Sequence, residues 1–264
     1  MSADATAITA DGQTIAYGLR GRRPVVGYAH GALLSRSAVR GLDLFDIDAL
    51  APDGALLTYD QRGHGQSTGR PVAEDYRFEH AASDLLAVLD AAGVDEPIDF
   101  VGSSLGAAAA LYAALIAPER FRRLALLIPP VSWETGPNHM RQWYADAADR
   151  VEQIGPTAWR REWAAAEPLP IFADYPPAAF DPDVADELLA PVLRGVGMSE
   201  LPEPHAVRTL PHPTLILAWQ TDPLHPVTTA AHLHVLIDDS RLDIAHSVSD
   251  IKTWTRQVAE FFGD

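Results

Sequence analysis

Short apolar runs alternate along most of the chain with segments in which apolar residues recur at helical spacing. The apolar runs of strand length lie at residues 24–29, 55–59, 98–101, 124–128, 214–219 and 241–244. The segments with helical spacing lie at residues 37–50, 78–92, 107–117, 227–237 and 248–262. Residues 6–20 alternate loosely around Asp11-Gly12, which predicts a β-hairpin. The pattern therefore predicts an α/β fold, a mostly parallel sheet of roughly eight strands covered by helices on both faces.

The alternation of strands and helices stops between residues 130 and 210. This segment is rich in proline and tryptophan, and its helical pieces lie near residues 140–154, 157–166 and 183–193. It shows no clear strand pattern. We therefore expect a core domain formed by residues 1–129 and 211–264, interrupted by a helical insertion at residues 130–210.

Composition narrows the class of protein further. The chain has 264 residues, a formal net charge of −16 and no cysteine. The absence of cysteine excludes disulfides, a thiol nucleophile and cysteine-ligated metal. The negative charge repels phosphate backbones, so nucleic acid is not an expected partner. No metal-ligand spacing, phosphate loop or dinucleotide fingerprint occurs, so we expect chemistry without a cofactor, on a small-molecule substrate.

The compartment is predicted from two missing signals. The first residues lack the basic stretch and apolar run of a secretory signal, and no window approaches about 18 uninterrupted apolar residues. We expect a cytoplasmic protein that does not interact with a membrane, either a monomer or a homodimer.

A G-x-S-x-G pattern lies between an apolar run and a helical segment. Its residues are Gly102-Ser103-Ser104-Leu105-Gly106. This context is typical of a nucleophile elbow, a tight strand-to-helix turn that exposes a serine hydroxyl above a sheet. Ser104 is the predicted nucleophile. Ser103 stands one place off the centre, so its side chain is expected to point into the fold.

A serine nucleophile needs a base to take its proton and an acid to orient that base. His246 is the preferred base because it lies in the loop between a short strand and the final helix. Asp222 precedes it and is the preferred acid, which gives the chain order Ser, Asp, His. Glu134 is the reserve acid. His225 is the reserve base, although its loop already contains Asp222.

The candidate residues share a position relative to the predicted strands. The residues that directly follow a strand are His30, Asp60, Ser104, Asp222 and His246. Ligands of parallel sheets bind outside the carboxyl ends of the strands, so these residues are expected to meet there. The oxyanion donors are expected to be the backbone N–H groups of Leu105 and Ala32.

Together these motifs resemble the α/β-hydrolase fold enzymes over almost the full chain outside the insertion. The motifs are His30-Gly31, Asp60-Gln61-Arg62-Gly63-His64-Gly65-Gln66-Ser67, Gly102-Ser103-Ser104-Leu105-Gly106, Asp222 followed by Pro226, and His246. The resemblance implies a serine hydrolase with Ser104, Asp222 and His246 as catalytic residues. It also implies that the insertion is a helical cap over the active site and that the loop at residues 60–67 is mainly structural.

The sequence departs from the pattern of these relatives at three positions. Trp219 and Ala245 stand where relatives often have glycine, and Trp219 suggests a bulky wall near the acid. Leu105 stands where perhydrolase- and haloperoxidase-like members frequently have methionine, which disfavours a peroxide-dependent activity.

The expected activity is hydrolysis of a carboxylic ester or lactone through an acyl-enzyme. Hydrolysis of a carbon–carbon or amide bond uses the same residues, and a non-catalytic small-molecule binding protein is the alternative of another class. Aromatic residues concentrated in the insertion suggest an apolar pocket. The residues expected to line it are His30, Trp133, Trp143 and Trp219.

Overall fold

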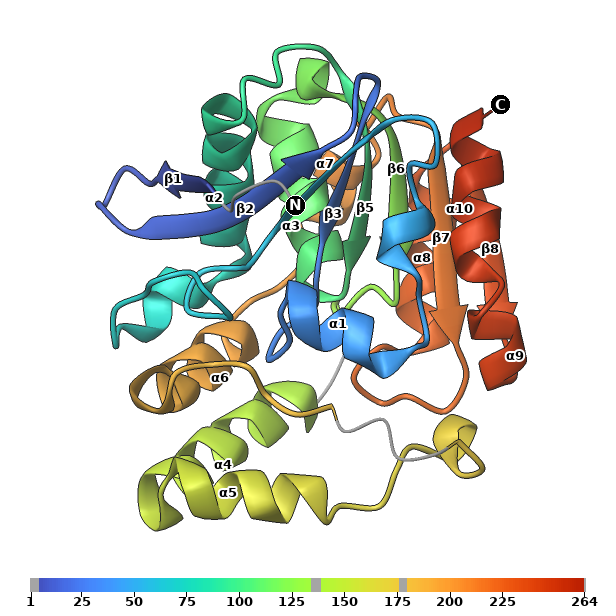
Figure 1. The fold of residues 1–264 in the computed structure, drawn as a ribbon. Helices are drawn as coiled ribbons and strands as arrows, with labels where there is room; N and C mark the ends of the chain where they lie inside the picture. The colour runs from blue at the N-terminus through green and yellow to red at the C-terminus, as the bar shows by residue number, and fades with distance from the viewer. Residues whose placement is uncertain (1–4, 134–138, 176–179, 264) are drawn as a thin grey trace.

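The computed structural model describes residues 5–133, 139–175 and 180–263, and within them the chain forms one eight-stranded sheet (Figure 1). The strands are β1 (Ala5–Ile8), β2 (Thr14–Arg20), β3 (Val25–Ala29), β4 (Ala55–Tyr59), β5 (Ile98–Ser103), β6 (Phe121–Leu127), β7 (Thr214–Trp219) and β8 (Ser240–Ala245). Their order in the sheet is β1-β2-β4-β3-β5-β6-β7-β8. The hairpin strands β1 and β2 pair antiparallel, and β3 to β8 are parallel. The predicted α/β fold class is confirmed.

Helices cover both faces of this sheet. The helices of the core are α1 (Arg36–Leu42), α2 (Phe78–Ala91), α3 (Leu105–Ile116), α7 (Pro204–Val207), α8 (Val227–Leu236), α9 (Val248–Ile251) and α10 (Trp254–Gly263). Successive residues of a strand belong alternately to two apolar clusters, one on each face of the sheet. In β6, Leu124 and Leu126 pack with α2, α3 and α8, whereas Ala125 and Leu127 pack with α1 and α10. This alternation is the two-residue period of a strand that is buried on both faces. None of the described helices is long and apolar enough to cross a bilayer.

A second group of helices lies beyond the end of the sheet at which the parallel strands terminate (Figure 1). These are α4 (His139–Ile154), α5 (Pro156–Ala164) and α6 (Leu189–Gly197). The segment between α5 and α6 is tied to the core by backbone hydrogen bonds, from Asp183 N to Leu33 O at 2.7 Å and from Gly65 N to Asp183 O at 2.9 Å. The insertion is therefore anchored to the loops that follow β3 and β4.

Three helices depart from the predicted ranges by more than two residues. The helix predicted at residues 37–50 ends at Leu42, because Asp43 adopts a left-handed φ of 52°, and a short 3-10 turn (Ile47–Ala49) follows. The helix predicted at residues 248–262 is divided into α9 and α10 at Thr253, whose hydroxyl donates to Asp250 O at 2.7 Å. A polar side chain that bonds the preceding backbone competes with helix continuation. The helix predicted at residues 183–193 begins later, as α6.

Candidate active site

The turn from β5 into α3 carries Ser104 in a strained backbone conformation. Its φ of 51° and ψ of −110° place a residue with a side chain in a region that usually favours glycine. A Cβ on Gly102 would lie 2.2 Å from the Gly106 carbonyl oxygen, and a Cβ on Gly106 would lie 2.3 Å from the Ala29 carbonyl oxygen. Only glycine therefore allows strand, helix and neighbouring strand to approach this closely.

The two serines of the turn face different surroundings. Ser103 Oγ lies 3.5 Å from the Tyr28 hydroxyl, a buried group beneath α1. Ser104 Oγ lies 2.7 Å from Nε2 of His225. Ser103 therefore faces the core, as its position in the motif predicts, and Ser104 presents its hydroxyl to an imidazole.

A single loop after β7 supplies both an acid and a base. Asp222 Oδ2 lies 2.7 Å from His225 Nδ1, whose other ring nitrogen meets Ser104 Oγ. Because a carboxylate only accepts, His225 Nδ1–H donates to Asp222 and leaves Nε2 to accept the serine proton. The serine, histidine and aspartate thus form a continuous hydrogen-bonded chain.

The Asp222 carboxylate is held by three donors. Besides His225, it accepts the indole Nε1–H of Trp219 on Oδ2 and the backbone N–H of Leu224 on Oδ1, each at 2.8 Å. Burial raises the pKa of Asp222, but the charge and hydrogen bond of His225 and the Trp219 and Leu224 donors outweigh burial and leave the pKa below its usual value. The carboxylate is therefore ionised at neutral pH and can stabilise an imidazolium.

The structure corrects the assignment of the base. The side chain of His246 is exposed, and its backbone N–H donates to Asp250 Oδ2 at 2.9 Å. Ser247 caps α9 directly after it. Within the described chain His246 forms no hydrogen bond with Ser104 or Asp222, because the loop after β8 turns at once into α9. His225, the reserve base, occupies the position expected for His246.

The loop after β3 approaches the serine closely. A Cβ on Gly31 would lie 3.2 Å from Ser104 Cβ, so Gly31 leaves room for the nucleophile. Among the described residues, the backbone N–H groups of Ala32 and Leu105 have no hydrogen-bond partner, whether backbone or side chain. Two donors close to the serine are what a developing oxyanion requires, and their role stays a prediction.

Two buried histidines support this loop. His30 donates from Nδ1 to Gly31 O at 2.8 Å and accepts the Gln61 N–H at 2.9 Å. His64 donates from Nδ1 to Arg62 O at 2.8 Å and accepts the Leu33 N–H at 3.0 Å. Burial lowers the pKa of His30, and burial together with His30 lowers the pKa of His64 to about 3. Both rings are therefore neutral at pH 7. His30 has no exposed surface, so in this structure its side chain belongs to the scaffold of the loop and not to the lining of an open pocket, where it was predicted.

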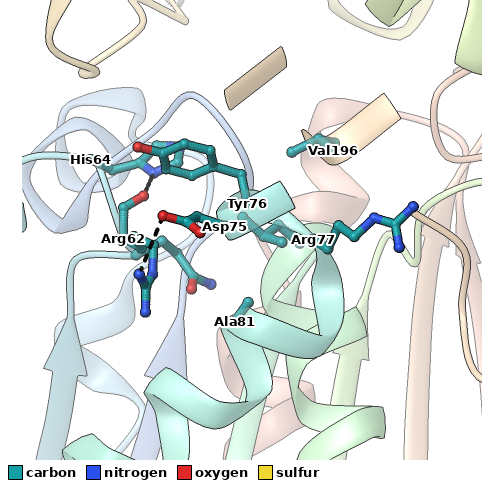
Figure 2. A pocket seen from close by; sticks show the side chains of 9 residues that line it. Arg62, His64, Asp75, Tyr76, Arg77, Ala81 and Val196 are labelled. Carbon is teal, nitrogen blue, oxygen red and sulfur yellow. Dashed lines mark hydrogen bonds and ion pairs between the residues drawn. The ribbon is translucent and has the colours of Figure 1, made fainter. Parts of the chain in front are cut away.

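The loop after β4 is held in place by ion pairs of the buried Arg62 side chain. The Arg62 guanidinium pairs with Asp84 at 2.7 Å and with Asp11 at 2.6 Å. Arg62, His64, Asp75 and Leu105 are among the residues that line a cavity of about 10 Å³ (Figure 2). That volume holds about one water molecule and no substrate. The loop thus supports the start of α3 structurally.

The predicted pocket tryptophans lie in three different environments. Trp133 packs its ring against His232 of α8 at 5.0 Å, and Trp143 packs against Tyr144 and Trp163 inside the insertion. These ring contacts pack segments of the fold together, and the place of Trp133 and Trp143 in a substrate pocket stays a prediction. Trp219 alone contacts the acid. The reserve acid Glu134 lies outside the described residues.

Comparison with known proteins identifies the family to which the fold belongs. The model of the alpha/beta hydrolase fold family matches residues 28–167. A Pseudomonas savastanoi pv. phaseolicola protein named "Putative carbamate hydrolase RutD" is 25% identical over 231 residues, which cover 82% of this chain and 86% of that protein. A hydrolase from Pseudomonas aeruginosa PA01 superposes with a TM-score of 0.82 at 22% identity over 99% of both chains. The enol-lactonase of Burkholderia xenovorans LB400 gives a TM-score of 0.80 at 18% identity over 98% of this chain and 100% of the other.

The chain belongs to the alpha/beta hydrolase fold family. Within that family it is a hydrolase. The resemblance predicted from the sequence motifs is confirmed.

Proposed function

We propose that the protein is a serine hydrolase that cleaves a carboxylic ester or lactone through an acyl-enzyme on Ser104, His225 and Asp222. The observation that carries the proposal is the chain of two 2.7 Å hydrogen bonds from Ser104 Oγ through His225 to Asp222. A nucleophile, a base and an acid in this arrangement define the reaction class independently of their order in the sequence.

The chemistry follows from the protonation states in this chain. Ser104 Oγ attacks the substrate carbonyl while its proton passes to His225 Nε2, and Asp222 stabilises the resulting imidazolium. The N–H groups of Leu105 and Ala32 stabilise the oxyanion of the tetrahedral intermediate. When the intermediate collapses, the leaving oxygen takes the proton from His225. Water then attacks the acyl-enzyme by the same route and releases the carboxylic acid and Ser104.

The ester and lactone class is supported by the chemistry of an activated serine and by a fold shared with an enol-lactonase. A carbamate is the second candidate substrate, because the similar RutD protein bears the name of a carbamate hydrolase. Its carbonyl carbon is open to the same attack by Ser104. The partner in either case is a small molecule.

The experiment that tests the proposal is labelling with a fluorophosphonate probe, which modifies an activated serine. The wild-type protein and Ser103→Ala are expected to be labelled, and Ser104→Ala is not. Ser103→Ala is the matched control, since it removes the neighbouring hydroxyl that faces Tyr28. Turnover of p-nitrophenyl esters of rising chain length, lactones and an aryl carbamate then identifies the bond cleaved. An unlabelled wild-type protein, or a labelled Ser104→Ala variant, contradicts the proposal.

A further inference from the structure

The indole of Trp219 reaches the same carboxylate oxygen as the catalytic imidazole. Trp219 is the last residue of β7 and is buried. Its Nε1–H donates to Asp222 Oδ2 at 2.8 Å, and His225 Nδ1 lies 2.7 Å from that same oxygen. Since an indole N–H can only donate, this contact places a fixed donor beside the hydrogen bond that orients the base.

The Trp219 ring packs against two other aromatic rings. It stacks on Trp254 of α10 with ring centroids 5.7 Å apart and planes 10° apart. It meets the edge of Phe172, from the insertion, at 5.3 Å and 83°. Contacts of this kind restrict the rotation of an aromatic side chain. The donor therefore has little freedom to leave the carboxylate.

The acid–base loop needs such external support because of its length. Asp222 and His225 are three residues apart, so a rotation of the carboxylate would carry the imidazole hydrogen bond with it. The Leu224 N–H holds Oδ1 from within the loop, whereas Trp219 holds Oδ2 from the sheet. One of these two supports is thus independent of the loop's own conformation.

We propose that Trp219 is a positioning residue, whose indole N–H orients Asp222 and through it His225 toward Ser104. This inference rests on the proposed function, because it assigns a role within the same triad. The base of this hydrolase lies in the loop after β7, and that short loop cannot by itself fix the orientation of the Asp222 carboxylate. Trp219 fixes this orientation from its place at the end of the β7 strand. Besides His225, Tyr144 of α4 is a described titratable group whose pKa is affected by the charge of Asp222. Burial is the larger cause that raises the pKa of Tyr144, the Asp222 charge raises it further, and the tyrosine therefore stays neutral.

The test compares Trp219→Phe with Trp254→Phe. Both variants keep an aromatic ring in the stack, but only the first removes a donor from Asp222, because Trp254 Nε1 has no hydrogen-bond acceptor among the described residues. The measurement is the second-order rate at which a fluorophosphonate probe labels Ser104 between about pH 5 and pH 9, a range that spans histidine titration. This readout needs no knowledge of the substrate.

We expect Trp219→Phe to lower the labelling rate at neutral pH by roughly ten- to a hundredfold, the size of one hydrogen bond to a charged group. The acid-side midpoint should also move to higher pH, because a carboxylate with one donor fewer is more basic and favours the imidazolium. Trp254→Phe should keep the wild-type midpoint. Circular dichroism is expected to show both variants folded.

Two outcomes would overturn the role of Trp219. One is a Trp219→Phe variant with the wild-type labelling rate and the wild-type midpoint of the pH profile. The other is a Trp254→Phe variant whose midpoint shifts as much as that of Trp219→Phe, which would show that the effect comes from the packing of the rings and not from the hydrogen bond. In both cases Ser104 of the wild type is labelled, so the proposed function stands. A wild-type protein that the probe does not label would instead overturn the proposed function, and this inference with it.

Discussion

Asp222 and His225 are hydrogen-bonded through Oδ2 and Nδ1 at 2.7 Å although only two residues separate them in the chain. Thr221 before them has a left-handed φ of 68°, and the Leu224 N–H closes a turn onto Asp222 Oδ1. Pro226, the residue directly before α8, restricts the backbone of His225. One short loop therefore carries both the carboxylate and the imidazole, and the loop after β8 is free to form α9.

The position of the base gives the most direct prediction. His225→Gln should lower the activity by about three to four orders of magnitude, because it removes the proton acceptor of Ser104. His246→Gln changes an exposed side chain outside this chain of hydrogen bonds and should leave the activity at the wild-type value. The measurement is kcat/KM on the ester that turns over fastest. The reverse ranking of the two variants would restore His246 as the base.

Replacing the acid should act through the orientation of the imidazole. In Asp222→Asn the amide no longer requires a proton on His225 Nδ1, so the histidine can carry its proton on Nε2, where it cannot accept from Ser104. We expect kcat to fall by about 10³–10⁴. The KM should change little, since Asp222 lies behind the base. A kcat within the range of the wild type would show that the Asp222 hydrogen bond does not orient the catalytic group.

The glycines of the nucleophile elbow should affect the free energy of unfolding, which can be measured independently of the catalytic activity. Gly102→Ala would place a methyl group 2.2 Å from the Gly106 carbonyl oxygen, and we expect the free energy of unfolding to fall by about 1–3 kcal/mol. The control is Gly41→Ala, at an exposed helical position where a Cβ meets nothing within 4 Å. It should raise the free energy of unfolding by about 0.5–1 kcal/mol. Urea titrations of both variants give these values, and equal effects would contradict the close approach.

The neutral histidine His64 predicts how stability depends on pH. Its pKa is near 3 in the fold and rises to its ordinary value of 6.5 on unfolding, so below about pH 6.5 the unfolded chain binds a proton that the fold excludes. Stability should therefore fall as the pH drops, by roughly 2 kcal/mol at pH 5 from this group. His30, whose pKa is lowered by burial, acts in the same direction.

This prediction is checked by unfolding His64→Gln between about pH 7 and pH 5. The variant has no group to titrate at this position, so its stability should depend less steeply on pH than that of the wild type. His246→Gln, which alters an exposed histidine, should keep the wild-type slope. Parallel slopes for the wild type and His64→Gln would contradict a neutral buried His64.

The alternation of apolar runs and helical segments was sufficient for the fold, because the signals involved are local. A buried parallel strand has an apolar run of strand length, and the turn after β5 needs glycine at Gly102 and Gly106 wherever it occurs. The candidates Ser104 and Asp222 followed from the same local logic, as residues directly after strands. Helix ends were less accurate where a single residue decided them, as at Asp43 and Thr253.

The sequence could not decide which of His225 and His246 is the base, because both residues follow a strand and both can reach the carboxyl end of the sheet. What decided it was three-dimensional: the turn at Asp222 aims His225 at Ser104, while the loop after β8 begins α9 at once. The indole contact of Trp219 with Asp222 depends in the same way on the stack with Trp254, 35 residues further along the chain by number. Local pattern thus determined the sheet, the elbow and the class of chemistry, whereas the identity of the base and its support depended on distances between segments that no local pattern encodes.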